Sequence, residues 1–223
     1  EWKYVDKLED IATEIRCLYL NSNDGSANDV FHSGVLTTEK PGQVKPDQFV
    51  YDPLDTRQGE MEAKANPEYI FDQTGALNLF GNGLVYHTEP FEEDTEVSGY
   101  VKLNTWIEMD VPDTDFGVTL YEILPDGRSV WLSSDMMRAR YRESLREEKL
   151  VVPGEINQYT FEWFTWFSRC IRKGSRLRLV FGCINSPQME KNYNAGGVVN
   201  EESGKDARTA HVKFYHDAQH PAC

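Results

Sequence analysis

The strongest constraint on the fold is a strict alternation of side chains between residues 97 and 109. One set of alternate positions is apolar or small, namely Val97, Gly99, Val101, Leu103, Thr105, Ile107 and Met109. A period of two is the repeat of a β-strand, because successive side chains point to opposite faces of a sheet. This segment is therefore predicted to be one strand with a buried face and a solvated face.

Turn-forming residues separate this strand from the next β-rich runs. Asp110-Val111-Pro112-Asp113 is predicted to reverse the chain into residues 116–124. Pro125-Asp126-Gly127 is predicted to reverse it again into residues 129–132. Proline, aspartate and glycine favour turns, and β-rich runs joined by turns are typical of an antiparallel meander. We expect an antiparallel β protein.

Further strands are predicted at 158–167, 176–184 and 211–216, with a short edge strand at 49–51. Residues 37–75 are otherwise loop-like, and only a weak helical stripe stands near the start, at Leu8, Ile11 and Ile15. Many strands and few helices predict an all-β, jelly-roll β-sandwich with long loops and little helix.

The composition of the chain limits the classes of partner that it can bind. The chain has 223 residues and a formal net charge of −14, which opposes binding to nucleic acid or to anionic membranes. No apolar run approaches the roughly 20 residues of a membrane span. Neither a linker nor a shift in composition divides the chain, so one globular domain is favoured. The sequence leaves localisation unknown.

Four cysteines, Cys17, Cys170, Cys183 and Cys223, are widely spaced and form no Cys-x-x-Cys motif. Free thiols are the favoured interpretation. A disulfide stays open, but its pairing does not follow from the sequence.

Catalytic, cofactor-binding and metal-binding motifs are missing from the sequence. The chain has no Gly-x-Ser-x-Gly nucleophile motif. His216 and Asp217 are strand neighbours that face opposite ways, so they are poorly placed to form a triad. His216 and His220 lie four apart but are followed by proline, which disfavours a helical zinc pair. We therefore predict no catalytic residue, cofactor or metal within this chain.

Two clusters of residues invite a functional interpretation. The arginines between 138 and 146 resemble an anion site, but neutralisation by Glu143, Glu147 and Glu148 is the favoured interpretation. Trp163 and Trp166 are candidate ligand-binding or interface aromatics, although burial between the two layers is favoured over a sugar-stacking platform.

Several segments, taken in order, resemble a known family. They are Asp113-Thr114-Asp115-Phe116, Pro125-Asp126-Gly127-Arg128-Ser129, Arg138-Ala139-Arg140-Tyr141-Arg142, Gly174-Ser175-Arg176-Leu177-Arg178-Leu179, Asn192-Tyr193-Asn194-Ala195-Gly196, and Tyr215-His216-Asp217 followed by His220-Pro221. Together they are similar to the C-terminal domain of the X-Pro dipeptidyl-peptidase and CocE/NonD hydrolases. The match runs from about residue 18 to the end.

The resemblance implies a galactose-binding-domain-like jelly roll, packed on an α/β-hydrolase domain that lies upstream and holds the serine, aspartate and histidine of the triad. Residues 1–17 would be the end of that domain or a linker from it, and 18–223 the sandwich. The chain is then an excised, non-catalytic support domain that shapes the cleft of its parent or an oligomer interface. Alone it would be inactive, although the parent resembles a dipeptidyl-peptidase or an acyl esterase or amidase. The alternative is a stand-alone carbohydrate-binding module.

Overall fold

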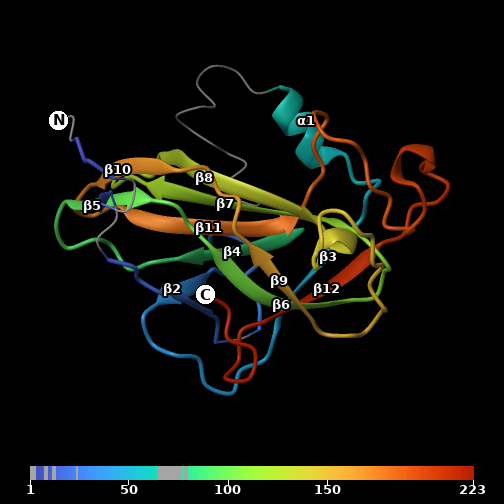
Figure 1. The fold of residues 1–223 in the computed structure, drawn as a ribbon, viewed down its shortest axis with the longest axis horizontal. Helices are drawn as coiled ribbons and strands as arrows, with labels where there is room; N and C mark the ends of the chain where they lie inside the picture. Colours follow the sequence, from blue (N-terminus) through green and yellow to red (C-terminus); the bar gives the residue numbers. More distant parts are fainter. Residues whose placement is uncertain (1–3, 8–9, 12–13, 24, 65–76, 78–79) are drawn as a thin grey trace.

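The computed structural model describes residues 4–7, 10–11, 14–23, 25–64, 77 and 80–223, and it shows two packed β-sheets (Figure 1). The larger sheet has the strand order β1-β2-β4-β11-β7-β8. Its strands are β1 (Tyr19–Asn21), β2 (Gly34–Thr37), β4 (Gly83–His87), β7 (Asp115–Ile123), β8 (Ser129–Arg138) and β11 (Arg176–Cys183). All neighbours are antiparallel except β2 and β4, which run parallel.

The second sheet has the antiparallel order β3-β12-β6-β9. Its strands are β3 (Asp47–Tyr51), β6 (Leu103–Met109), β9 (Asn157–Phe161) and β12 (Ala210–Tyr215). A separate pair joins β5 (Thr95–Gly99) to β10 (Phe167–Ile171). The prediction of a β-sandwich is confirmed, as is the edge strand at 49–51. The described part of the chain holds one α-helix, α1 (Arg57–Ala63), which had no predicted counterpart.

The strand predicted at 97–109 is in fact two strands. Leu103, Thr105, Ile107 and Met109 alternate inward as expected, but β5 pairs with a different partner from β6. The break begins at Gly99, whose φ of +128° is a conformation that suits only glycine well. The two pairs form one ribbon with a bulge, in which residues 162–166 lie opposite residues 100–102.

The predicted turn at residues 110–113 is also corrected. It is no hairpin, because β6 and β7 belong to different sheets and the segment carries the chain from one layer to the other. The next turn is a true hairpin: β7 and β8 pair along their length, and Gly127 has a φ of +88°. Sequence patterns identified the strands here but not the layer that each one joins.

The core consists of side chains from both inner faces. Phe181 of β11 is fully buried and contacts four other aromatic rings. Its centroid lies 5.0 Å from that of Phe214, 5.3 Å from Phe116, 5.9 Å from Phe161 and 6.4 Å from Phe49. Most pairs are edge-to-face, the favourable geometry for aromatic contacts. Because Phe116 belongs to the larger sheet and the other three to the smaller one, this cluster joins the layers.

The last residues of the chain also join the two sheets. The backbone N–H of Leu20 in β1 donates to the carbonyl of Ala222 over 3.0 Å, while Cys223 exchanges backbone hydrogen bonds of 2.8 and 3.1 Å with Asn104 in β6. The terminal segment therefore lies between an edge strand of one layer and a strand of the other.

The helical stripe predicted near the start is not supported where the structure describes it. Leu8 lies outside the described residues, Ile15 is exposed, and residues 14–18 form neither helix nor strand. Among the described residues, no helix is long and apolar enough to cross a membrane.

One buried polar pair on the larger sheet is sensitive to acid. The Nε of Arg178 donates to Nε2 of His87 over 2.7 Å, across the β4–β11 pairing. Burial, and then the charges of Arg178 and Arg176, lower the pKa of His87 from 6.5 to about 4. His87 therefore stays neutral in the folded protein at pH values where the unfolded chain is protonated.

We expect the free energy of unfolding to fall by about 1–2 kcal/mol as the pH drops from 6.5 to about 4. In that range only the unfolded chain takes up a proton on this side chain, and below it both states are protonated, so the loss stops. Urea unfolding at several pH values measures the slope. The variant H87Q keeps an acceptor for Arg178 but does not titrate. Its free energy of unfolding should therefore fall by about 1–2 kcal/mol less than that of the wild type over the same pH range. An identical slope in H87Q would contradict the assignment.

Candidate functional site

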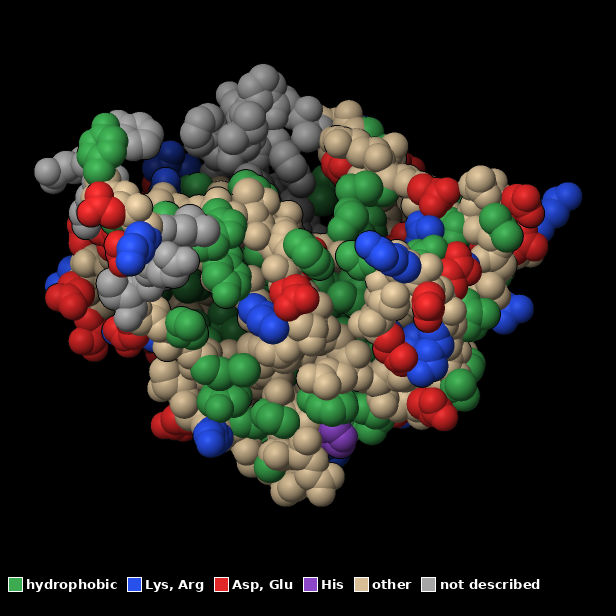
Figure 2. Space-filling view, viewed as in Figure 1, with side chains coloured by type: hydrophobic (Ala, Val, Ile, Leu, Met, Phe, Trp, Pro, Cys, Tyr) green, Lys and Arg blue, Asp and Glu red, His purple; other side chains and the backbone are tan. Residues whose placement is uncertain are grey.

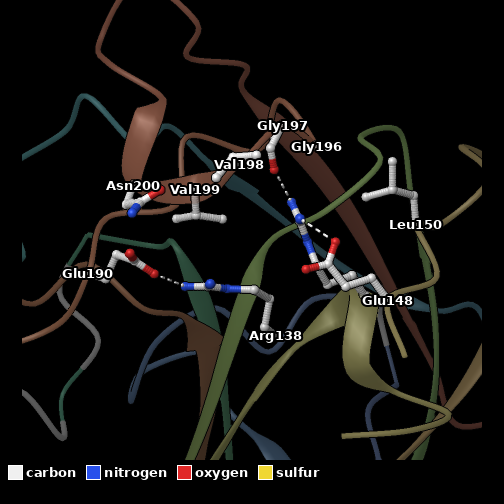
Figure 3. A pocket seen from close by; sticks show the side chains of 10 residues that line it. Arg138, Glu148, Leu150, Glu190, Gly196, Gly197, Val198, Val199 and Asn200 are labelled. Carbon is white, nitrogen blue, oxygen red and sulfur yellow. Dashed lines mark hydrogen bonds and ion pairs between the residues drawn. The ribbon is translucent and has the colours of Figure 1, made fainter. Parts of the chain in front are cut away.

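A pocket of about 410 Å³ opens where the end of β8 meets the loop between β11 and β12 (Figure 3). Its lining comes from three segments, and the lining residues are Arg138, Arg140, Glu148, Leu150, Glu190 and residues 196–200. It is the candidate site because Arg138 and Arg140, which belong to a segment on which the family resemblance rests, line it together with two glutamates.

A buried ion pair forms the base of this region. Arg140 lies in a short 3₁₀ helix after β8, and Asp113 precedes β7. The backbone N–H and Nε of Arg140 donate to the two carboxylate oxygens of Asp113, each over 2.9 Å. Both side chains are almost completely buried, at 5% and 0% exposure. The remaining guanidinium nitrogens bind the carbonyl of Gly197 and the carboxylate of Glu148 (Figure 3).

A second ion pair lies beside the first because Asp115 and Arg138 are register partners in β7 and β8. Arg138 donates from Nε and Nη2 to the two oxygens of Asp115 over 2.8 and 3.0 Å. Its Nη2 also reaches Glu190 over 3.0 Å. Such a fork geometry gives strong charge-assisted hydrogen bonds.

Asn192 connects the two ion pairs. Its Nδ2 donates to Asp113 over 2.9 Å and to Asp115 over 2.8 Å, and its Oδ1 accepts from the backbone N–H of Asn194. Asn194 has a φ of +65°, which asparagine tolerates better than most residues. The Asn192-Tyr193-Asn194 motif therefore fixes the loop against the ends of β7 and β8.

The pKa directions follow from burial and pairing. Burial raises the pKa of Asp113, and the hydrogen bond from Asn192 and the charge of Arg140 only partly oppose it. The hydrogen bonds and charge of Asp115 raise the pKa of Arg138 despite partial burial. Burial is the largest single influence on the pKa of Arg140 and lowers it, but the charges and hydrogen bonds of Asp113 and Glu148 together outweigh burial, so the net direction is upward.

This Arg138–Arg140 network is suited to holding structure together rather than to chemistry. Two arginines face four carboxylates, those of Asp113, Asp115, Glu148 and Glu190, so the site does not favour an anion. Among the described residues, no group of three or more His, Cys, Asp and Glu side chains is placed to hold a metal ion. The expected neutralisation is confirmed for Arg140 and Arg142, which pair with Glu148 and Glu143, but the principal partners of Arg138 and Arg140 are Asp115 and Asp113.

His216 was considered for a triad with Asp217 and for a zinc pair with His220, and the structure gives these residues different partners. His216 is completely buried, with Nε2 2.9 Å from Oδ2 of Asp47, whose oxygens also accept from Ser22 and Tyr86 over 2.6 and 2.7 Å. Asp217 instead contacts His220, at 3.2 Å. The serine therefore bonds to the aspartate rather than to the histidine, and the cluster is sealed from solvent. This arrangement supplies no activated nucleophile.

Trp163 and Trp166 are exposed by 68% and 46%, so the expectation that they are buried between the layers is wrong. They stand in the bulge at residues 162–166, where the period of two is lost. Phe164 takes the inward position instead and is 4% exposed. The ring of Trp166 lies 5.1 Å from that of Tyr100, at an interplanar angle of 42°.

Comparison with known proteins bears on these findings. A family model described as "X-Pro dipeptidyl-peptidase C-terminal non-catalytic domain" matches residues 1–222. Cocaine esterase of Rhodococcus sp. (strain MB1 Bresler) is 28% identical over 214 residues, which are 89% of this chain and 35% of that protein. This chain thus spans about a third of the relative it matches.

Two solved structures share the fold. An aminopeptidase from a marine sediment Thaumarchaeota archaeon superposes with a TM-score of 0.75 at 20% identity, over 92% of this chain and 35% of its own. An α-amino acid ester hydrolase gives a TM-score of 0.74 at 19% identity, over 92% and 34%.

Replacing Arg140 by methionine should lower the free energy of unfolding by about 3–5 kcal/mol, because the buried carboxylate of Asp113 loses its countercharge. Urea unfolding followed by tryptophan fluorescence measures the loss. The matched control is R128M, since Arg128 forms an ion pair with Asp126 on the exposed turn and both side chains are more than half exposed. The control should unfold like the wild type. An R140M protein as stable as R128M would remove the structural role assigned to the network.

Proposed function

Because this chain belongs to the family of X-Pro dipeptidyl-peptidase C-terminal non-catalytic domains, we propose that it supports the catalytic domain of a serine hydrolase. That domain would be an α/β-hydrolase unit earlier in the same polypeptide, with dipeptidyl-peptidase or acyl esterase or amidase activity. Residues 1–17 would lead in from it, and residues 18–223 would form the support. The proposal rests on the family match and on the lack of any assembled nucleophile and base among the described residues.

The surface that best suits contact with such a domain is the aromatic patch, defined as Tyr100, Trp163 and Trp166. Exposed tryptophans are costly to leave in water and are enriched where proteins contact each other. Figure 2 shows that hydrophobic side chains gather in several exposed clusters among charged ones on one face of the molecule. The aromatic patch consists of two exposed indole rings and an exposed phenol that is tilted by 42° to the ring of Trp166.

The backbone beneath the aromatic patch is well anchored. The N–H of Trp163 donates to Asp135 over 2.9 Å, and the hydroxyl of Ser133 donates to the carbonyl of Thr165 over 2.6 Å. Both partners belong to β8, while Phe164 is inserted into the core. The indoles are thus presented by a fixed segment, so little conformational entropy is lost when a partner covers them.

A carbohydrate-binding module is the second candidate, since the same tryptophans could stack on sugar rings. The geometry of the patch favours the first candidate. The rings of Tyr100 and Trp166 are tilted by 42° to each other rather than coplanar, so they do not form one flat platform. Fold alone does not establish sugar binding.

We expect the isolated chain to fold but not to hydrolyse a Gly-Pro or Ala-Pro chromogenic dipeptide or a chromogenic acyl ester. The physical reason is that Ser22, which shares a buried cluster with Asp47 and His216, donates to the aspartate rather than to the histidine and is sealed from solvent. A purified sample is assayed with and without a serine-directed covalent inhibitor. Turnover that the inhibitor abolishes would refute the support role.

Burial of the aromatic patch is tested by acrylamide quenching of tryptophan fluorescence. In the isolated chain Trp163 and Trp166 should be quenched efficiently, and in the longer natural polypeptide they should be protected. The double variant W163F/W166F should remove that difference, whereas the control W131F, which changes an exposed tryptophan of β8, should keep it.

Equal quenching in both lengths of chain would contradict the interface. Calorimetric binding of a glycan that W163A or W166A abolishes would instead favour the carbohydrate module. Concentration-dependent protection in the isolated chain would assign the patch to a homo-oligomer interface rather than to the catalytic domain.

A further inference from the structure

The charges around the pocket of Figure 3 are arranged in layers from the core to the solvent. The two aspartates of the Arg138–Arg140 network lie deepest. The side chains of Arg140 and Arg138 follow, at 5% and 23% exposure. Glu148 and Glu190 are outermost, at 57% and 49% exposure, and they lie on opposite sides of the pocket. A molecule that enters the pocket therefore meets carboxylates before it meets arginines.

Both arginines are already hydrogen-bonded within the network. Arg140 uses Nε and Nη1 on carboxylates and Nη2 on the carbonyl of Gly197. Arg138 donates from Nε and Nη2 to Asp115 and from Nη2 to Glu190. An anion in the pocket would compete with these partners and would also be repelled by the outer carboxylates, so the pocket favours a cation.

The two outer glutamates keep capacity for further donors. An ionised carboxylate can accept about four hydrogen bonds. Glu190 accepts one on Oε2, from Arg138, and its Oε1 accepts none from the described residues. Glu148 accepts from Tyr141 over 2.8 Å and from Arg140 over 3.2 Å, so its carboxylate is held in a defined orientation. The hydrogen bond from Tyr141 lowers the pKa of Glu148, which keeps this group ionised at neutral pH.

The rest of the lining includes an apolar surface. Leu150 and Val198 line the pocket, and both side chains are exposed. Gly196 has a φ of +84°, and a Cβ there would lie 2.8 Å from Cγ of Pro112, so the wall carries no side chain at this position. Aliphatic stems of long cationic side chains pack on surfaces of this kind while their charged ends stay near water.

We propose that this pocket binds a cation on an aliphatic stem, namely a guanidinium or ammonium group of the kind that arginine and lysine carry. Glu148 and Glu190 supply the countercharge, and Leu150 and Val198 contact the stem. The volume of about 410 Å³ is within the range of roughly 300–1,000 Å³ that is usual for small-molecule sites. The proposal does not depend on the function proposed above. Its ligand is either a free small molecule or a side chain of the longer polypeptide.

Calorimetric titration of the purified chain with N-acetyl-argininamide tests the proposal. Its matched control ligand is N-acetyl-citrullinamide, which has the same shape but no charge. We expect the arginine derivative to bind, and to bind less tightly as the salt concentration rises. The citrulline derivative should bind at least about tenfold more weakly, because hydrogen bonds between charged groups are stronger than neutral ones.

The variants E148Q and E190Q remove one charge each and keep the size of the side chain. Each should weaken binding of the arginine derivative by about three- to tenfold, and the double variant should weaken it further. The matched control is E147Q, which changes the net charge equally at an exposed residue outside the pocket and should bind like the wild type. Thermal unfolding establishes that each variant is folded.

Three results would overturn the proposal: equal binding of the two ligands, no binding of the arginine derivative at millimolar concentration, or a loss in E147Q as large as that in E148Q. The same titration of the longer natural polypeptide distinguishes the two sources of the cation. Unchanged binding there would assign the pocket to a free small molecule. Binding that is lost there would assign it to a side chain of the polypeptide itself.

Discussion

The structure depends on the contacts between the ring of Phe181 and aromatic rings of both sheets. Phe181 stands near the middle of β11, and the four rings around it belong to both layers. Burial of these rings removes a large apolar area from water and sets the spacing of the layers. The register of β11 with β7 then fixes what lies beyond the core, because Cys183 pairs with Phe116 and the N–H of Ile184 binds the carbonyl of Asp115. The Arg138–Arg140 network is thus built on strand ends whose positions the core has already determined.

This network shows how a protein keeps charges inside at tolerable cost. Arg140 and Asp113 lose almost all contact with water, which is unfavourable for each ion alone. Asn192 and the carbonyl of Gly197 supply the remaining hydrogen bonds, so no charge is left partly satisfied. The result is a loop between β11 and β12 that is held by directional bonds as well as by the buried side chain of Val199. Such bonds specify one arrangement, which is useful in a segment with little regular structure.

Much of the fold could be predicted from the sequence wherever the alternation of side chains was sufficient to identify a strand. The alternation at 103–109 was identified with the correct inward side chains, and the strands predicted at 176–184 and 211–216 correspond to β11 and β12. The pairing of β6 and β7 was mispredicted because a turn signal does not show which sheet the next strand enters. Likewise, Trp163 and Trp166 lie in a bulge created by unequal lengths of two paired segments. That inequality is a property of the pairing and is invisible in either segment alone.

The candidate site was predictable in part for the same reason. The arginines were correctly expected to be neutralised, since acidic residues follow them in the chain, but the principal partners come from the start of β7. The segments that carry the family resemblance include Asp113, Arg140 and Asn192, but the resemblance does not indicate that these side chains are in contact. The backbone hydrogen bonds of Leu20 with Ala222 and of Asn104 with Cys223 join segments that are far apart in the sequence, and no local pattern reports that.

The backbone hydrogen bonds of Ala222 and Cys223 also affect how the chain folds. Leu20 is hydrogen-bonded to Ala222, 202 positions later in the sequence, and Asn104 is hydrogen-bonded to Cys223, 119 positions later. The hydrogen bond of Leu20 in β1 therefore closes a loop of about two hundred residues, which costs chain entropy before the contact forms. Contacts of such separation slow folding and leave intermediates open to aggregation. The join that Ala222 and Cys223 make between the two layers therefore belongs to the late steps of folding, after the intervening strands have found their partners.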